Sequence, residues 1–378
     1  MQYRYFTRDN LKVSQLGFGC MRFPILNKDS GQIDEVKATE MLHYAIDNGV
    51  NYIDTAYPYH KGNSEIFVGN ALKDGYREKI YLATKLPVWL TNSYEDFEKY
   101  LDEQLERLQT EYIDFYLLHT LSKKTWNKIK DLNVLHFLDE AKRKGKIKYA
   151  GFSFHDKVEV FKEIIDSYSW DFCQIQLNYM DRQYQAGLEG LKYAKEKSIS
   201  VAIMEPIKGG KLSNPSKEIE EIWNRSDIKR TPSEWALRWL FNQEEISVVL
   251  SGMSTLDHVK ENIKTASEGL SNSLTQEELS LIDEVTKVYT EGIKVGCTAC
   301  EYCLPCPQNV VIPDVFEYYN NLYVYGTEKE SKNAYNRLIE LEKDSSRCIE
   351  CGACEEACPQ HINIREQLKN ADIVLRAK

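Results

Sequence analysis

The sequence predicts an α/β fold: a (β/α)8 or TIM barrel followed by a small, mainly helical domain. The first observation is an alternation, because short β-branched runs precede longer amphipathic stretches eight times between about residues 15 and 265. The second is the distribution of cysteine, since the first 296 residues hold two of the ten and the last 82 hold eight. We therefore expect a barrel over residues 1–292 and a separate domain over residues 293–378.

Eight segments have the composition expected of buried parallel strands. The glycine-containing segment at the end of the first of them, Gly17-Phe18-Gly19-Cys20-Met21, lacks the third glycine of a dinucleotide-binding open sheet and is followed by a long loop instead of a helix. A closed barrel is therefore favoured over a doubly wound sheet. In chain order the predicted strands are residues 15–20, 52–54, 80–84, 115–118, 148–151, 172–176, 200–203 and 247–250.

Amphipathic stretches with apolar residues at helical spacing separate these strands. A hairpin over residues 3–14, turning at Asp9-Asn10, is expected to close the bottom of the barrel. Residues 205–231 are expected to form a long loop that acts as a lid on the active face. The predicted helices cover residues 34–48, 94–108, 134–143, 158–167, 187–197, 233–241, 256–266 and 274–289.

The charge balance excludes two classes of partner. The chain carries 48 basic and 58 acidic residues, a net charge of −10, so neither nucleic acid nor an anionic membrane surface is an expected partner. No apolar run approaches the roughly 18 residues that span a bilayer. The first residues show no secretory signal, and we expect a cytoplasmic protein.

Polar side chains stand at the carboxyl ends of three successive predicted strands: Asp54 is the last residue of its strand, and Lys85 and His119 come directly after theirs. Taken singly, Asp54 would be interpreted as a cap, Lys85 as a solvated lysine, and His119 as a core histidine with its hydrogen bonds made. Because the carboxyl ends of barrel strands face the active site, their succession predicts a catalytic site instead.

These residue types suit proton transfer to a carbonyl oxygen during hydride transfer. Tyr59 could supply the proton if the Lys85 ammonium lowered its pKa from about 10 towards neutrality. Asp54 would hold the lysine in place and charged, and His119 would orient the substrate oxygen. His60, next to the tyrosine, is expected to be a surface loop residue.

The Asp-Thr-Ala-x-x-Tyr segment at residues 54–59, with Lys85 and His119, resembles the catalytic tetrad of the aldo-keto reductase superfamily. The similarity covers about residues 3–285. It implies that Tyr59 is the general acid and that a nicotinamide cofactor lies extended across the barrel mouth. It also implies a small carbonyl or alcohol substrate.

The same resemblance implies a set of cofactor-binding residues. Phe154 and Met204 depart from the family pattern, and Gly252 and His258 stand where NADP-specific members often have basic residues, so NAD and NADP are both candidates. The implied residues are Gly19 at the first strand, Ser153 and Gln174 at the carboxamide, Gly209, Gly210 and Leu212 at the pyrophosphate, and Glu261 and Asn262 at the adenine.

Eight cysteines form two runs that are typical of iron–sulfur ligands. Each run has three cysteines separated by two residues and a fourth followed by proline, whereas zinc ribbons use two separate pairs and disulfides conflict with a cytoplasmic location. The remaining two, Cys20 and Cys173, are expected to be buried apolar residues. The runs are Cys297, Cys300, Cys303 and Cys306, and Cys348, Cys351, Cys354 and Cys358.

In ferredoxins of this type the fourth cysteine ligates the other cluster. We therefore expect two [4Fe-4S] clusters, with Cys306 completing the second run and Cys358 completing the first, and a single cluster is the alternative. Helices are predicted over residues 315–322 and 332–343, so this part resembles a helical ferredoxin-like domain.

The two parts together resemble the aldo-keto reductase subgroup with a C-terminal ferredoxin-like domain. The favoured hypothesis is a nicotinamide-dependent enzyme that reduces an aldehyde or ketone, or oxidises the alcohol. One alternative is an iron–sulfur oxidoreductase that exchanges electrons with a ferredoxin or flavoprotein. Another is a redox sensor that binds the cofactor. No flavin motif is visible, but a barrel phosphate site could accept a flavin.

Overall fold

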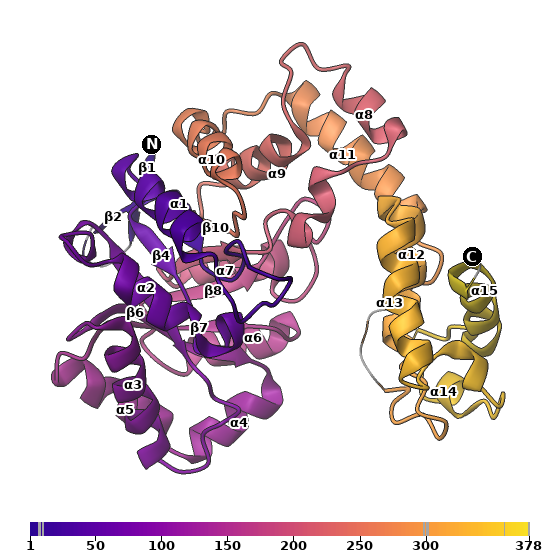
Figure 1. Ribbon diagram of the computed structural model, residues 1–378, viewed down its shortest axis with the longest axis horizontal. Coiled ribbons are helices and arrows are strands. Elements are labelled where there is room, and N and C mark those ends of the chain that lie inside the picture. The colour runs from indigo at the N-terminus through magenta and orange to yellow at the C-terminus, as the bar shows by residue number, and fades with distance from the viewer. Residues whose placement is uncertain (7–8, 10, 298, 300–301, 359, 377–378) are drawn as a thin grey trace. The chain divides into compact units, whose positions relative to one another are not determined.

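The computed structural model describes residues 1–6, 9, 11–297, 299, 302–358 and 360–376, and it contains two compact units (Figure 1). The first unit is Met1–Gly210 with Ser233–Thr275, and the second is Lys211–Pro232 with Gln276–Lys378. The division does not follow chain order, whereas the predicted boundary at residues 292 and 293 does. That boundary stays a prediction.

Eight parallel strands close into a barrel in the order β10-β3-β4-β5-β6-β7-β8-β9, which confirms the predicted fold class. Strands β5 and β6 run further than predicted, so Lys85 and His119 lie within the strands rather than after them. The strands are β3 Leu16–Gly19, β4 Tyr52–Asp54, β5 Tyr81–Leu86, β6 Ile113–Leu121, β7 Ile147–Phe154, β8 Phe172–Gln176, β9 Ser200–Met204 and β10 Ile246–Ser251.

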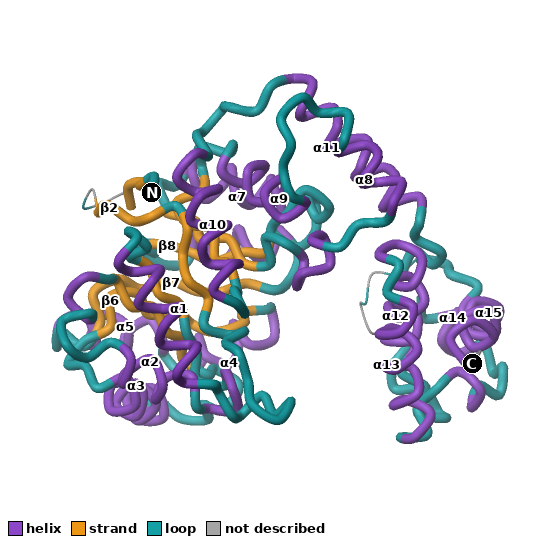
Figure 2. Tube along the Cα trace, turned by 45° about the horizontal axis from the view of Figure 1, so that its top comes forward, coloured by secondary structure: helices purple, strands orange, loops and turns teal. Residues whose placement is uncertain are grey.

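Helices surround these strands, as Figure 2 shows in purple around orange. Amphipathic spacing explains their packing: the helix Glu95–Leu108 buries Phe97, Leu101 and Leu108 on one face. Helices α2 and α4 were not predicted. The helices of this part are α1 Glu35–Asp47, α2 Ser64–Ala71, α3 Glu95–Leu108, α4 Lys123–Asp131, α5 Val134–Arg143, α6 Val158–Asp166, α7 Gly187–Glu196, α9 Pro232–Phe241 and α10 Leu256–Glu268.

The predicted N-terminal hairpin is present as β1 (Tyr3–Phe6) and β2 (Leu11–Ser14), which pair antiparallel. Phe6 packs with Val13 and with residues from the first half of several barrel strands, and its ring lies 4.7 Å from that of Phe115. The hairpin therefore closes this end of the barrel. Asn10 of the predicted turn lies outside the described residues.

The segment expected to be an all-loop lid contains a 3-10 turn, Lys208–Ser213, and the helix α8, Lys217–Trp223. That expectation was wrong because Ile219, Ile222 and Trp223 recur at helical spacing and are buried. From Lys211 onward the segment belongs to the second unit, where the Lys211 ammonium lies 3.0 Å from the Glu317 carboxylate.

The second unit is helical, as predicted. Helix α11 contacts α8, with an ion pair between Arg225 and Glu284. The core of the C-terminal part gathers Val315, Phe316 and Tyr335, and several cysteines pack against it. No helix within the described ranges has the length and apolarity needed to cross a membrane. The helices are α11 Gln276–Glu291, α12 Ile312–Tyr325, α13 Glu328–Glu340, α14 Ala353–Glu356 and α15 Ile364–Arg376.

Candidate functional site

A cavity of about 450 Å³ opens at the carboxyl ends of the barrel strands. Strand ends and the loops that follow them form its wall, which is where barrel active sites lie. Nine of the twelve candidate residues of the barrel line it: Gly19, Asp54, Tyr59, Lys85, His119, Ser153, Gln174, Gly209 and Gly210.

Lys85 is the centre of the polar network in this cavity. Its Nζ donates to Asp54 Oδ1 at 2.7 Å, to the Thr55 carbonyl at 2.8 Å and to Tyr59 Oη at 3.3 Å. The side chain is fully buried. Burial lowers the pKa of Lys85, but the Asp54 carboxylate and Tyr59 outweigh it, so the pKa is raised and the amine stays charged.

Tyr59 opens the 3-10 turn Tyr59–Gly62 and directs its hydroxyl towards Lys85. Burial raises the pKa of Tyr59, and the Lys85 ammonium opposes this rise without cancelling it. The expected net lowering of the Tyr59 pKa is therefore wrong in this structure. At neutral pH the residue is a neutral phenol, which is the form that can donate a proton.

His119 stands beside the tyrosine, with 6.2 Å between their ring centroids, and Trp89 approaches its ring at 5.2 Å. Burial, followed by the charges of Lys85 and His155, holds the pKa of His119 well below its usual range. The imidazole is therefore neutral at pH 7. Its buried Nδ1 has no hydrogen-bond partner among the described residues.

Ser153 and Gln174 occupy paired positions on β7 and β8. The Ser153 hydroxyl accepts a hydrogen bond from the Thr120 amide at 2.7 Å. Within the described chain, Gln174 Oε1 is buried and has no partner. An unpaired acceptor at this depth suits a ligand amide, so these residues fit the carboxamide of a nicotinamide ring.

Gly209 and Gly210 have φ values of +67° and +92°, a backbone conformation that glycine adopts without strain. At Gly210 an added side chain would meet nothing within 4 Å, so the loop offers an open backbone surface to the cavity.

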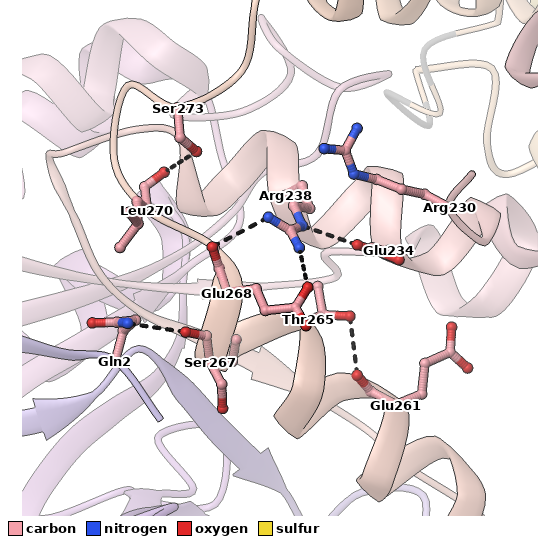
Figure 3. A network of polar contacts seen from close by, with 12 residues as sticks. Gln2, Arg230, Glu234, Arg238, Glu261, Thr265, Ser267, Glu268, Leu270 and Ser273 are labelled. Atoms are coloured by element: carbon pink, nitrogen blue, oxygen red, sulfur yellow. Dashed lines mark hydrogen bonds and ion pairs between the residues drawn. The ribbon is translucent and has the colours of Figure 1, made fainter. Parts of the chain in front are cut away.

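Three predicted cofactor residues do not line the cavity: Leu212, Glu261 and Asn262. Leu212 is buried in the second unit, whereas Asn262 donates to the hydroxyl of Ser251, a lining residue, at 2.9 Å. Figure 3 shows Glu261 on α10, one turn before Thr265, whose hydroxyl donates to the Glu261 carbonyl at 3.0 Å. Their part in cofactor binding stays a prediction.

Sequence reasoning missed several lining residues, among them Met21, Arg22 and His155. Met21 and Arg22 come just after β3, and His155 comes directly after β7. The rule that identified Asp54, a polar side chain at the end of a strand, could not find them from the sequence. Arg22 comes three residues after β3, and the predicted strand before His155 ends at residue 151 whereas β7 runs to Phe154.

The second unit contains a cavity of about 100 Å³ lined by five cysteines, Cys303, Cys306, Cys348, Cys351 and Cys354. The last four are the set that crossed ligation assigns to one cluster, and the Glu350 amide donates to Cys348 Sγ at 3.4 Å. Thiols that converge on one cavity fit an iron–sulfur cluster.

The other predicted ligand set is only partly described. Cys297 and Cys358 are half-buried, and Cys300 lies outside the described residues. In the described part of the chain, no three His, Cys, Asp or Glu side chains converge as a single metal ion requires. Thiolates that bind different irons of a cubane are further apart than ligands of one ion.

Two family models match the chain. Residues 15–287 match the model described as Aldo/keto reductase family, and residues 296–362 match the model described as 4Fe-4S dicluster domain. The first match covers the barrel and the second covers both cysteine runs, so the iron–sulfur assignment of the C-terminal domain is confirmed.

Individual proteins are similar over the barrel. Uncharacterized oxidoreductase YqkF of Bacillus subtilis is 29% identical and the match covers 76% of this chain and 97% of that protein. NADH-specific methylglyoxal reductase of Escherichia coli is 24% identical, with 70% and 93% covered. The solved aldo-keto reductase AKR11C1 of Bacillus halodurans (holo form) is 30% identical, with a TM-score of 0.64 over 75% of this chain and 96% of that one.

Proposed function

Because this chain belongs to the aldo/keto reductase family and is an oxidoreductase, we propose that it interconverts a small carbonyl compound and its alcohol with a nicotinamide cofactor. Tyr59 is the general acid in the reducing direction and the general base in the oxidising direction. The observation that carries the proposal is the bonding of Lys85 to both Asp54 and Tyr59 inside the barrel cavity.

The proton comes from Tyr59 Oη. While the carbonyl is being reduced, negative charge develops on its oxygen. This oxygen then accepts the proton that the buried neutral phenol has held. The phenolate that remains lies against the Lys85 ammonium, which Asp54 keeps charged and fixed. In the oxidising direction the same phenolate takes the proton of the alcohol.

His119 orients the substrate oxygen. Its ring is neutral and close to Tyr59, so it can hydrogen-bond the oxygen without adding a second positive charge beside Lys85. Two donors that converge on one oxygen fix the position of the carbonyl relative to the proton.

The nicotinamide, when bound, supplies the hydride for carbonyl reduction or accepts it in alcohol oxidation. Ser153 and Gln174 hold its carboxamide, and Gly209 with Gly210 allows the close approach of its pyrophosphate. NAD and NADP both remain candidates, and the name of the NADH-specific relative from Escherichia coli favours NAD.

Replacing Tyr59 with phenylalanine tests the proposal, because Tyr59→Phe removes only the acidic hydroxyl. We expect kcat to fall by at least a hundredfold, the usual contribution of general acid catalysis, with cofactor affinity unchanged. Tyr57→Phe is the matched control, since that hydroxyl bonds to Glu103 and does not line the cavity. Retention of turnover by Tyr59→Phe would overturn the assignment of the general acid.

For the C-terminal domain we propose two [4Fe-4S] clusters with crossed fourth ligands, Cys306 and Cys358. A second candidate function, electron exchange with a ferredoxin or flavoprotein, is favoured by the exposure of Cys351 and of the neighbouring Ile349 at the cysteine-lined cavity. A hydride carries two electrons and a cluster accepts one, so exchange between the two parts needs a mediator such as a flavin. The complete tetrad weighs against a sensor without catalysis.

A further inference from the structure

His60 follows the proposed general acid and is buried, with only 7% of its surface exposed, although the sequence suggested a surface residue. Its φ of +51° places it in the left-handed region, inside the turn Tyr59–Gly62. Histidine adopts this region more often than most residues, and the contacts of the His60 side chain offset the remaining strain.

Both ring nitrogens of His60 contact the loop that follows β3. Nδ1 lies 2.7 Å from the Ser30 carbonyl, and Nε2 accepts a hydrogen bond from the Phe23 amide at 3.3 Å. The Ser30 contact requires a proton on Nδ1, and the Phe23 contact requires a free lone pair on Nε2. These two contacts favour the neutral tautomer that carries its proton on Nδ1. Burial lowers the pKa of His60 and outweighs the backbone groups of Ser30 and Cys20, which raise it.

The loop that follows β3, which His60 contacts, forms part of the wall of the barrel cavity. Met21 and Arg22 line the cavity, and Phe23, whose amide reaches His60, comes next in the chain. The Phe23 side chain is buried and packs edge-on against Phe67 of α2, with 4.8 Å between ring centroids. A shift of His60 would therefore move the cavity wall.

Tyr59 and His60 share one peptide group but make contacts in different places. The Tyr59 hydroxyl contacts Lys85, and the His60 ring contacts Ser30 and the Phe23 amide. We propose that His60 is a positioning residue, which fixes the Tyr59 hydroxyl and the Met21–Arg22 wall in one arrangement. The proposal rests on the proposed role of Tyr59 as general acid.

His60→Gly is the informative variant, because glycine adopts the left-handed conformation freely and only the ring contacts are lost. Loss of two buried hydrogen bonds and of the positioning that they provide should lower kcat/KM roughly tenfold and raise the KM for the nicotinamide cofactor. Hydrogen exchange of residues 21–34, followed by mass spectrometry, should become faster. Nitrogen-15 NMR of the wild type should show the proton on Nδ1.

Lys61→Gly is the matched control in the same turn. Lys61 also has a positive φ, of +54°, and its ion pair with Asp29 is exposed and worth little. This variant should retain wild-type kcat/KM, and its exchange over residues 21–34 should rise less than in His60→Gly, because Lys61 contributes an exposed ion pair to that segment rather than buried hydrogen bonds. An equal loss in both variants would assign the effect to the turn as a whole and overturn the proposal.

His60→Asn provides a rescue, since asparagine tolerates the left-handed region and its amide can donate towards Ser30. It should recover part of the kcat/KM that His60→Gly loses, and no recovery would overturn the positioning role. Unchanged exchange in His60→Gly, or faster exchange with unchanged kcat/KM, would also overturn it. Turnover retained by Tyr59→Phe would instead refute the proposed function, whereas the exchange measurement still tests the His60 contacts.

Discussion

The Lys85 ammonium lies 2.7 Å from Asp54 Oδ1, and both side chains are almost completely buried at the ends of neighbouring strands. Replacing one partner of such a pair is strongly destabilising, because the other partner is left as a buried charge without compensation. The two residues should therefore behave as a single unit in both folding and catalysis.

Substituting only one of the two partners should destabilise the protein. Asp54→Asn leaves the ammonium uncompensated and should lower the free energy of unfolding by about 3 kcal/mol, as should Lys85→Met. The double variant removes both charges and should recover most of this loss, although it stays inactive. Denaturant unfolding of the four proteins gives the coupling energy, and strict additivity of the two single losses would contradict the pairing.

The buried His119 should make stability sensitive to acid. Because its folded-state pKa is depressed, the unfolded chain binds a proton below about pH 6.5 that the folded chain does not accept. The free energy of unfolding should therefore fall as the pH drops below that value. His119→Gln should lose less stability than the wild type between pH 8 and pH 5, and an identical pH dependence would argue against a buried neutral imidazole.

Replacing Gln174 should weaken cofactor binding without lowering the stability of the protein. Gln174→Leu removes a buried acceptor without a partner in the described chain, so stability should be unchanged or slightly higher, while the cofactor KM rises roughly tenfold. Gln176→Leu is the matched control on the same strand, because the amide of Gln176 donates to Asp181 at 2.9 Å. It should lose about 1 kcal/mol of stability and keep the wild-type KM.

Protein purified without oxygen should contain about eight irons and eight sulfides per chain, as two [4Fe-4S] clusters require. Cys351→Ser should lower the iron content towards half, because that thiol lines the cysteine cavity. Cys173→Ala should leave it unchanged, because Cys173 is buried in β8. About four irons in the wild type would refute the assignment of two clusters.

Anaerobic addition of NADH tests whether the clusters exchange electrons with the barrel site directly or only through a mediator. If they exchange electrons with the barrel site only through a mediator, the visible absorption near about 400 nm should bleach only after a flavin is added. EPR should then detect the reduced clusters. Bleaching by NADH alone would show that electrons reach the clusters without an added flavin.

Much of the barrel could be predicted because its strands are buried on both faces and therefore have continuous β-branched runs. The helix α4 was not predicted because its capping box pairs Ser122 with Thr125, whereas the sequence signature of a capping box has Glu or Gln at that position. The pKa of Tyr59 could not be predicted, because the degree of burial determines the balance against Lys85. The burial of His60 depends on partners 30 and 37 residues away, which no local pattern indicates.

The assignment of Lys211–Pro232 to the second compact unit has a consequence for biosynthesis. The chain passes between the units three times, after Gly210, after Pro232 and after Thr275. As the chain leaves the ribosome, α8 cannot pack against α11 until α11 has been synthesised. A nascent chain stalled before α11 should therefore expose the apolar face of α8 to chaperones, even when all eight barrel strands have already emerged.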